Sequence, residues 1–218
     1  MPVSDGDIII GVDTGNRCIK TVSTAFVSGL KTFDTQPPFM SNVLHYDGKY
    51  YAQSDERGEY IRDKTKSEDY FALTLIAIAK EIEHRGLYSE RPVDISLGVG
   101  LPPSHLPSLK APFQKYFERG GVTFVYKNRP FSIVIRDVQV FAQGYAAIFA
   151  DFDQIRRYPT AYIVDIGGYT TDVIALRHGK VDLSFCQSLN YGLIQLYNEV
   201  RSHISLMGLD VPSESMLD

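Results

Sequence analysis

Two short segments, far apart in the chain, each carry an acidic residue at the end of an apolar run, followed by glycine and small residues. They are residues 13–15 (Asp-Thr-Gly) and residues 165–168 (Asp-Ile-Gly-Gly). Glycine lets the backbone come close to a ligand and turn its N–H groups toward an anion. A short carboxylate beside such a turn suits Mg²⁺ held through water, because Mg²⁺ keeps several waters when it binds phosphates. Two such turns facing each other would clamp a triphosphate.

Lys20 follows the first turn on the next apolar run. Its ammonium group is a candidate for neutralising phosphate charge as a point charge. A lysine that faces solvent on a strand is the other interpretation, and the spacing through the turn does not decide between them. An isolated Asp-x-Gly is a weak signal, since many turns contain it. The pair of motifs, DTGNRCIK at 13–20 and DIGGYTTD at 165–172, is much stronger.

The first turn is expected within an antiparallel meander of three short strands, because β-branched runs there are separated by tight turns. The predicted strands are residues 7–13, 18–27 and 30–35, and Pro37-Pro38 ends the meander. A small hairpin is predicted at 45–51, turning at Asp47-Gly48. The charged stretch 57–66 is predicted to be a solvated surface loop.

A helix is predicted from an N-cap at Ser67 through Glu83, closed by Gly86. The run at 93–101 fits a strand that is buried on both faces. Further elements follow from periodicity and from glycine and proline positions. They are a helix at 104–119 ended by Gly120-Gly121, strands at 122–126 and 131–138, and an alanine-rich helix at 140–149.

A second meander surrounds the second acidic turn. Its predicted strands are 160–166, 170–176 and 180–186, with turns at Gly167-Gly168 and His178-Gly179. An amphipathic helix follows residues 190–192, with its apolar face at Leu193, Leu196, Val200 and Ile204. The repetition of an acidic turn between two strands predicts two related half-domains.

The composition is that of a globular protein, with 218 residues of which 44% are hydrophobic. The formal net charge of −4 argues against binding nucleic acid directly through a basic face. Cys18 and Cys186 are expected to be buried free thiols. No run approaches the roughly 20 apolar residues of a membrane span. No basic segment precedes an apolar run at the start, so we expect a cytoplasmic protein without a secretory signal.

Residues 8–20 and 162–174 resemble the two phosphate motifs of the actin, sugar kinase and heat-shock chaperone ATPase superfamily. Within it, the chain most resembles prokaryotic actin-like proteins of the ParM/StbA plasmid-segregation type. Residues 71–82, 97–103 and 135–149 are also similar to that family, and the resemblance spans roughly residues 8–205. It implies an α/β, actin-like (ribonuclease H-like) fold of mixed sheets with flanking helices, whose first half is complete and whose second half has only begun.

The resemblance also implies roles for individual residues. Asp13 and Asp165 would lie near a hydrated Mg²⁺ ion, Asp165 also near the attacking water, and Gln143, on the expected helix, would orient that water. A glutamine that only packs or bonds locally is the alternative for Gln143. The residues expected to contact the phosphates of ATP or GTP are Thr14, Gly15, Asn16, Lys20, Gly167, Gly168, Tyr169 and Thr170.

Complete actin-like proteins are longer, so the resemblance implies a chain truncated at its C-terminal side. We expect a first half at 1–159, with a small inserted subdomain at about 36–66, and an incomplete second half at 160–218. The complete protein would be an ATPase that forms filaments and segregates plasmid or other DNA through a DNA-binding adaptor protein, and this chain alone would be weak or inactive. A non-catalytic interaction module and a small-molecule kinase of the same superfamily remain alternatives.

Overall fold

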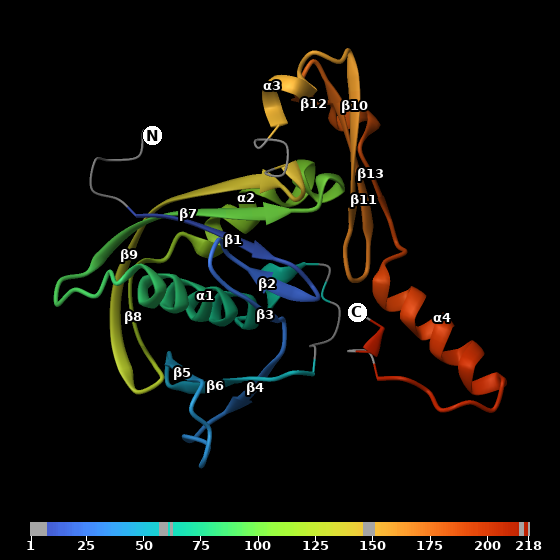
Figure 1. The fold of residues 1–218 in the computed structure, drawn as a ribbon. Helices are drawn as coiled ribbons and strands as arrows, with labels where there is room; N and C mark the ends of the chain where they lie inside the picture. The colour runs from blue at the N-terminus through green and yellow to red at the C-terminus, as the bar shows by residue number, and fades with distance from the viewer. Residues whose placement is uncertain (1–7, 57–60, 62, 146–150, 214–215, 218) are drawn as a thin grey trace. The chain divides into compact units, whose positions relative to one another are not determined.

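The computed structural model describes residues 8–56, 61, 63–145, 151–213 and 216–217 (Figure 1). The chain divides into two compact units. The first comprises Met1–Leu101 with His105–Gln143, and the second Pro102–Ser104 with Gly144–Asp218. Among the described residues, no helix is both long and apolar enough to cross a membrane.

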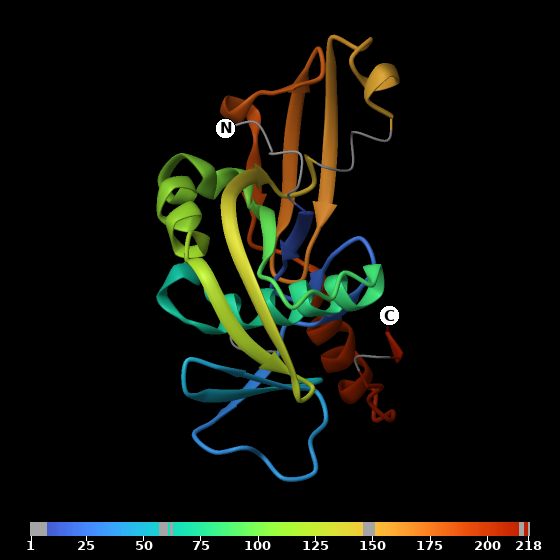
Figure 2. The ribbon, with the colours of Figure 1, turned by 90° about the vertical axis from the view of Figure 1, so that its left-hand side faces the viewer.

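A nine-stranded mixed sheet forms the first unit, in the order β3-β2-β1-β7-β9-β8-β5-β6-β4. The neighbours β1–β7 and β7–β9 are parallel, and the remaining pairs are antiparallel. Figure 2 shows β9 as a long, curved strand. The strands are β1 Ile8–Thr14, β2 Cys18–Lys20, β3 Ala25–Val27, β4 Leu30–Phe33, β5 Val43–Tyr46, β6 Lys49–Gln53, β7 Val93–Leu101, β8 Gly120–Tyr126 and β9 Arg129–Ala142.

Two helices, α1 (Asp69–Arg85) and α2 (Leu106–Phe117), complete the core of the first unit. Most of α1 is buried, and its Phe71 packs against Phe117 of α2 with ring centroids 6.1 Å apart. Gly86 ends α1 as predicted, because it takes the left-handed φ of 64° and its N–H bonds to helix carbonyls. The N-cap of α1 is Glu68 and not the predicted Ser67, whose hydroxyl accepts the N–H of Asp69 at 3.1 Å from one residue further upstream.

The predicted hairpin at 45–51 is confirmed as β5–β6. Its turn residues Asp47 and Gly48 have φ values of 49° and 72°. Such left-handed values at both central positions give the turn the twist that two antiparallel strands need.

The predicted first meander is only partly right. The run 18–27 is broken into β2 and β3 by a turn in which the Thr21 N–H bonds to the Thr24 carbonyl at 2.8 Å. The third strand, β4, pairs with β6 rather than with β3. The Thr-Val-Ser-Thr sequence therefore forms a turn that interrupts the predicted strand. The next strand, β4, pairs with the β5–β6 hairpin.

The predicted helix at 140–149 is wrong where the structure describes it. Residues 140–142 continue β9, because the parallel register with β7 runs on to the pair Leu101–Ala142. Residues 143 and 144 form a turn, residue 145 has a 3₁₀-helical conformation, and 146–150 lie outside the described residues. Alanine-rich composition favoured a helix, but pairing with a neighbouring strand outweighed that preference.

Three smaller differences concern termini and burial. The helix predicted at 104–119 is limited to Leu106–Phe117, and Gly120 and Gly121, which were predicted to end it, open β8. In the stretch 57–66, predicted to be solvated, Lys64 is only 4% exposed, while 57–60 and 62 lie outside the described residues. Cys18 and Cys186 are free, but only half-buried.

A hairpin of β10 (Thr160–Ile166) and β11 (Thr171–Arg177), as predicted, dominates the second unit. The strand expected at 180–186 is limited to β12 (Lys180–Val181), and Asp182 starts a single helical turn by accepting the N–H of Ser184. The remaining elements are η1 Lys64–Lys66, η2 Pro103–His105, α3 Phe152–Ile155, η4 Leu183–Phe185, β13 Gln187–Leu189 and α4 Leu193–Leu206.

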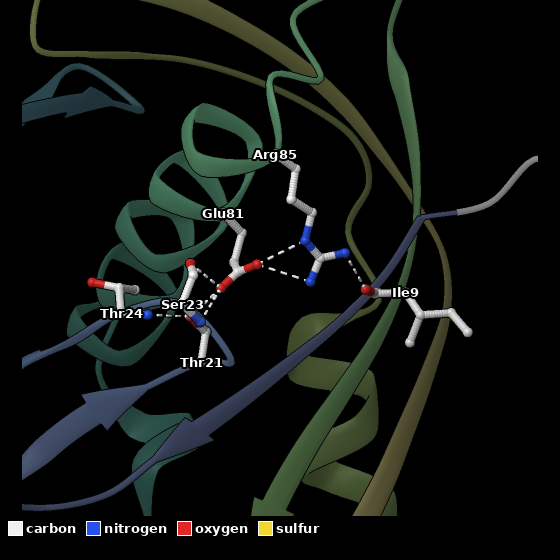
Figure 3. A network of polar contacts seen from close by, with 6 residues as sticks. All are labelled: Ile9, Thr21, Ser23, Thr24, Glu81 and Arg85. Atoms are coloured by element: carbon white, nitrogen blue, oxygen red, sulfur yellow. Dashed lines mark hydrogen bonds and ion pairs between the residues drawn. The ribbon is translucent and has the colours of Figure 1, made fainter.

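A buried carboxylate fastens α1 to the first strands (Figure 3). Glu81 is 1% exposed and accepts hydrogen bonds from the hydroxyls of Thr21 and Ser23 and from the backbone of Ser23. Its other oxygen binds Arg85, whose guanidinium also donates to the Ile9 carbonyl at 3.0 Å. Burial raises the pKa of Glu81, but these donors outweigh it and bring the pKa from 4.5 to about 2.

Replacing Glu81 with glutamine should destabilise the protein by roughly 2–3 kcal/mol at pH 7, because buried donors lose a charged acceptor. A carboxylate with a lowered pKa stabilises the fold above its unfolded pKa of 4.5 and stops doing so as pH falls through about 2. Denaturant unfolding between pH 7 and pH 2 should therefore show the difference between wild type and Glu81→Gln shrinking in acid.

The control is Glu83→Gln on the same helix, since Glu83 is more exposed and pairs with Lys127 at 3.3 Å. It should cost less than about 1 kcal/mol. A Glu81→Gln effect that stays constant from pH 7 to pH 2 would contradict the proposed origin of the stabilisation.

Candidate functional site

The first predicted turn joins β1 and β2, and the register of this hairpin brings two of the predicted site residues together. Asp13 lies directly opposite Lys20, and Thr14 lies opposite Ile19. Directly opposed residues of an antiparallel pair project from the same face of the sheet. Asp13 and Lys20 are both exposed on that face, whereas Thr14 and Ile19 face the core. A carboxylate and an ammonium group are therefore presented side by side at the end of the hairpin.

The carbonyl groups of this turn are bound from inside the unit. The buried Lys64 ammonium donates to the Thr14 carbonyl, and the Ser28 hydroxyl donates to the Gly15 carbonyl at 2.6 Å. The C=O and N–H of a planar trans peptide point in opposite directions. The N–H groups of Gly15 and Asn16 therefore point away from Lys64 and Ser28. Neither N–H donates a hydrogen bond to another of the described residues. Two successive amides presented in this way can bind an anion.

Sequence reasoning missed Lys64, Ser28 and Tyr70 as partners of this turn. Tyr70, in the first turn of α1, donates its hydroxyl to the Asn16 side chain at 2.8 Å, and the Lys64 ammonium lies 4.8 Å from the Tyr70 ring centroid. Lys64 lies in a charge-rich stretch. The composition of that stretch predicted a solvated loop, although the Lys64 side chain is buried. The position of Tyr70 beside the helix start was visible, but its partner was not.

Thr14 is fully buried, and its hydroxyl has no hydrogen-bond partner among the described residues. A buried hydroxyl without a partner is costly, and such groups in native proteins are usually satisfied by water or a ligand. The predicted site residue Thr14 thus contributes a carbonyl anchored to Lys64 and an unsatisfied hydroxyl next to the turn.

Gln143 follows β9 in a turn rather than in the expected helix. Its backbone N–H bonds to the Leu101 carbonyl at 2.8 Å, which anchors this turn to the end of β7. Its side-chain Nε2 donates to Asp13 at 3.2 Å. Gly100 makes room for it, since a Cβ at that position would lie 2.9 Å from the Gln143 Cγ. The structure therefore brings Gln143 to the acidic end of the first hairpin.

The second predicted turn joins β10 and β11, with Asp165 opposite Asp172. The Gly167 N–H bonds to the Thr170 carbonyl at 2.8 Å and closes the turn. Asp165 is half-buried, and the backbone of Gly144 approaches it so closely that a Cβ there would lie 3.3 Å from its carboxylate. Asp172 is 4% exposed and accepts from the Ser188 and Thr170 hydroxyls, which favours a structural role.

The N-terminus of α4 binds the carbonyls of this second turn. The Leu193 N–H donates to Gly167 at 3.0 Å, and the Ile194 N–H donates to Gly168 at 2.9 Å. By the same planarity, the amides of the following residues, Gly168 and Tyr169, point away from the helix. Gly192 allows this approach, because a Cβ there would lie 2.5 Å from the Gly168 oxygen. The carbonyls of the second turn are thus bound from within its unit, as those of the first turn are.

The structure gathers the predicted residues into two sets, one in each unit. The first set surrounds the β1–β2 turn and the second surrounds the β10–β11 turn. The members are Asp13, Thr14, Gly15, Asn16, Lys20 and Gln143 in the first unit, and Asp165, Gly167, Gly168, Tyr169 and Thr170 in the second.

Residues 11–145 match the family described as "Actin like proteins N terminal domain". The match covers more than half of the chain, and the protein therefore belongs to this family of actin-like proteins. No match is found among curated proteins.

Solved structures show the same fold at low sequence identity. The apo ParM protein of pSK41 has a TM-score of 0.69 at 15% identity, covering 92% of this chain and 71% of that chain. An AlfA filament bound to AMPPNP has a TM-score of 0.69 at 17% identity, covering 94% of this chain and 78% of that chain. The archaeal actin homologue Ta0583 in complex with ADP has a TM-score of 0.73 at 17% identity, covering 95% of this chain and 68% of that chain. The α/β actin-like fold predicted from the sequence is confirmed, and this chain spans 68% to 78% of the length of these relatives.

Replacing Gly15 with alanine should disrupt the first turn, because the added Cβ would lie 2.6 Å from the Cys18 carbonyl oxygen. We expect a loss of roughly 1–3 kcal/mol of stability, as for other overpacked sites. Hydrogen exchange should become faster in β1 and β2. Gly11→Ala on the same strand is the matched control, since nothing lies within 4 Å of its Cβ. Equal effects of the two substitutions would contradict this account of the turn.

Proposed function

We propose that the two hairpins bind the phosphates of ATP or GTP together with Mg²⁺, and that the protein acts as a nucleotide-hydrolysing, filament-forming actin-like protein. The observation that carries this proposal is the orientation of the two turns. In each, successive carbonyls are bound from within the unit, by Lys64 and Ser28 or by α4, so that successive amides are presented for an anion.

The residues present fit a phosphate ligand. The first turn supplies two amides and the Lys20 ammonium, all of which suit anionic oxygens. Asp13 and Asp165 would hold Mg²⁺ through water, in keeping with its preference for oxygen ligands and retained waters. That nucleotides are the ligands is supported by two relatives, an AlfA filament bound to AMPPNP and Ta0583 in complex with ADP.

The two hairpins are proposed to serve one ligand, as the first actin-like half at residues 1–159 and the start of the second at 160–218. The insertion at about 36–66 would form a small subdomain of the first half. The observations that support each half lie within its own unit. Gln143 binds Asp13 within the first unit, and the next residue, Gly144, lies against Asp165 within the second.

Roles in hydrolysis are assigned by position. Mg²⁺, when bound, would neutralise charge on the transferring phosphate. Lys20 would stabilise the same charge, and Asp165 would hold waters of the metal shell near the attacking water. The Gln143 amide can donate and accept at once, which suits a group that orients water for in-line attack. Its contact with Asp13 supports this placement.

Calorimetry of this chain with ATP and Mg²⁺ tests the binding, and phosphate release tests hydrolysis. We expect binding that weakens when Mg²⁺ is removed, and hydrolysis that is slow in this chain by itself. Asp13→Ala and Asp165→Ala should each lower Mg²⁺-dependent affinity about tenfold and abolish turnover, since each removes a group that holds the hydrated metal.

Asp94→Ala serves as the control, because Asp94 forms an exposed ion pair with Arg136. Unchanged affinity and turnover in both hairpin variants would refute the assignment. Absence of any binding by wild type would favour a non-catalytic interaction module. Turnover that requires an added alcohol substrate would favour a kinase, and competition between ATP and GTP would identify the preferred base.

Self-association into filaments, for the segregation of plasmid or other DNA in the cytoplasm through a DNA-binding adaptor, is the proposed cellular role. Its support is that similar structures include filaments of AlfA and of ParM from Clostridium botulinum. In the second unit, Leu196 and Leu206 of α4 are exposed, which leaves apolar surface for association.

Light scattering should therefore rise when the wild-type protein receives nucleotide and Mg²⁺, because a ligand that orders the hairpins would favour the assembling state. Asp165→Ala should remain at baseline. Sedimentation should recover polymer only from the nucleotide-containing sample. A wild-type protein that binds nucleotide but stays monomeric at high concentration would rule out filament formation by this chain.

A further inference from the structure

A lysine that is distant from the predicted motifs in the sequence supports the first hairpin from inside the first unit. Lys64 is 4% exposed, its ammonium donates to the Thr14 carbonyl, and it lies over the Tyr70 ring. Burying an ammonium group is costly unless hydrogen bonds compensate. A lysine kept in the core at the turn of a candidate phosphate site therefore calls for an explanation beyond packing.

The bond to Thr14 determines which way one peptide group faces. With its oxygen held by Lys64, the peptide between Thr14 and Gly15 must point the Gly15 N–H in the opposite direction. Without that donor, the peptide would be free to rotate, since glycine at one end tolerates most backbone angles. Ser28 has the matching role for the next peptide, through its hydroxyl on the Gly15 carbonyl.

The charge of Lys64 adds a second effect. Lys20 presents an ammonium on the exposed face of the hairpin, and Lys64 places another on the buried side of the same turn. Charges in the protein interior are screened less than charges in water. An anion bound at the Gly15 and Asn16 amides would therefore be attracted by Lys64 through the turn without touching it.

We propose that Lys64 is a positioning residue of the phosphate site: it orients the Gly15 amide toward the bound polyphosphate and supplies positive charge from behind the turn. This inference rests on the proposed function. The inference adds to the site a residue that lies outside both acidic motifs, and it states that this residue acts on the phosphate groups of the ligand.

Calorimetry with Mg-ATP and with inorganic tripolyphosphate, on wild type and on Lys64→Met, tests this inference. Loss of a charge-assisted hydrogen bond should weaken the binding of both ligands about tenfold or more. Lys64→Arg keeps the charge and a donor and should stay within about threefold of wild type. Lys66→Met is the matched control, since Lys66 lies two residues away and is exposed, and it should change affinity less than about twofold.

A second readout separates positioning from general stability. The amide resonance of Gly15 in an isotope-labelled sample should shift, and its exchange should become faster, in Lys64→Met but not in Lys66→Met. The measurement is made at a temperature at which circular dichroism shows each variant to be folded. Loss of thermal stability together with unchanged affinity and an unchanged Gly15 resonance would mean that Lys64 is only structural, and would overturn the proposal.

If Lys64→Met fails to fold, Ser28→Ala provides a second test. It removes only the hydroxyl that donates to the Gly15 carbonyl, which is next to the carbonyl bound by Lys64. It should weaken tripolyphosphate binding about threefold to fivefold, and unchanged binding there would also overturn the proposal. If wild type binds neither ligand, the proposed function fails and this inference fails with it. If wild type binds and Lys64→Met binds equally well, only this inference fails.

Discussion

The planarity of the peptide group is the constraint on which both candidate turns depend. A turn binds an anion only if several amides face the ligand together, and each amide is fixed by the direction of the carbonyl bonded to it. In both turns these carbonyls are satisfied from within the unit, by Lys64 and Ser28 in the first and by the first N–H groups of α4 in the second. The anchors differ in chemistry, but they impose the same orientation.

The wider scaffold can be understood as the means of holding these anchors. Glu81 fastens α1 to the β2–β3 turn and, through Arg85, to the beginning of β1, so both strands of the first hairpin are tied to one helix. The same helix carries Tyr70, which binds Asn16 in the turn. In the second unit, Gly192 lets the start of α4 reach the turn carbonyls. Polar groups buried in this way are stable only when all are paired, and that requirement favours one geometry.

Much of the fold was accessible from the sequence, because strand alternation, glycine turns and helix caps are local signals. The β5–β6 turn and the end of α1 at Gly86 are examples. The errors arose where distant pairing decided the outcome. Residues 140–142 joined β9 because β7 lay beside them, although their composition favoured a helix. The pairing of Asp13 with Lys20 also needed the register of the hairpin, which residue spacing alone left open.

The least predictable part of the site is what holds it from behind. Lys64 is separated from the Asp13 motif by many residues, and nothing in its own neighbourhood distinguishes it from a solvated lysine. Actin-like relatives at 15–17% identity keep the fold, so few individual side chains can be required for it. What the two turns of this chain share is backbone direction, obtained from a lysine and a serine in one case and from helix amides in the other. Motif reading finds the turns, because glycine and aspartate recur there, but it cannot find their supports, because any donor in the right place will serve.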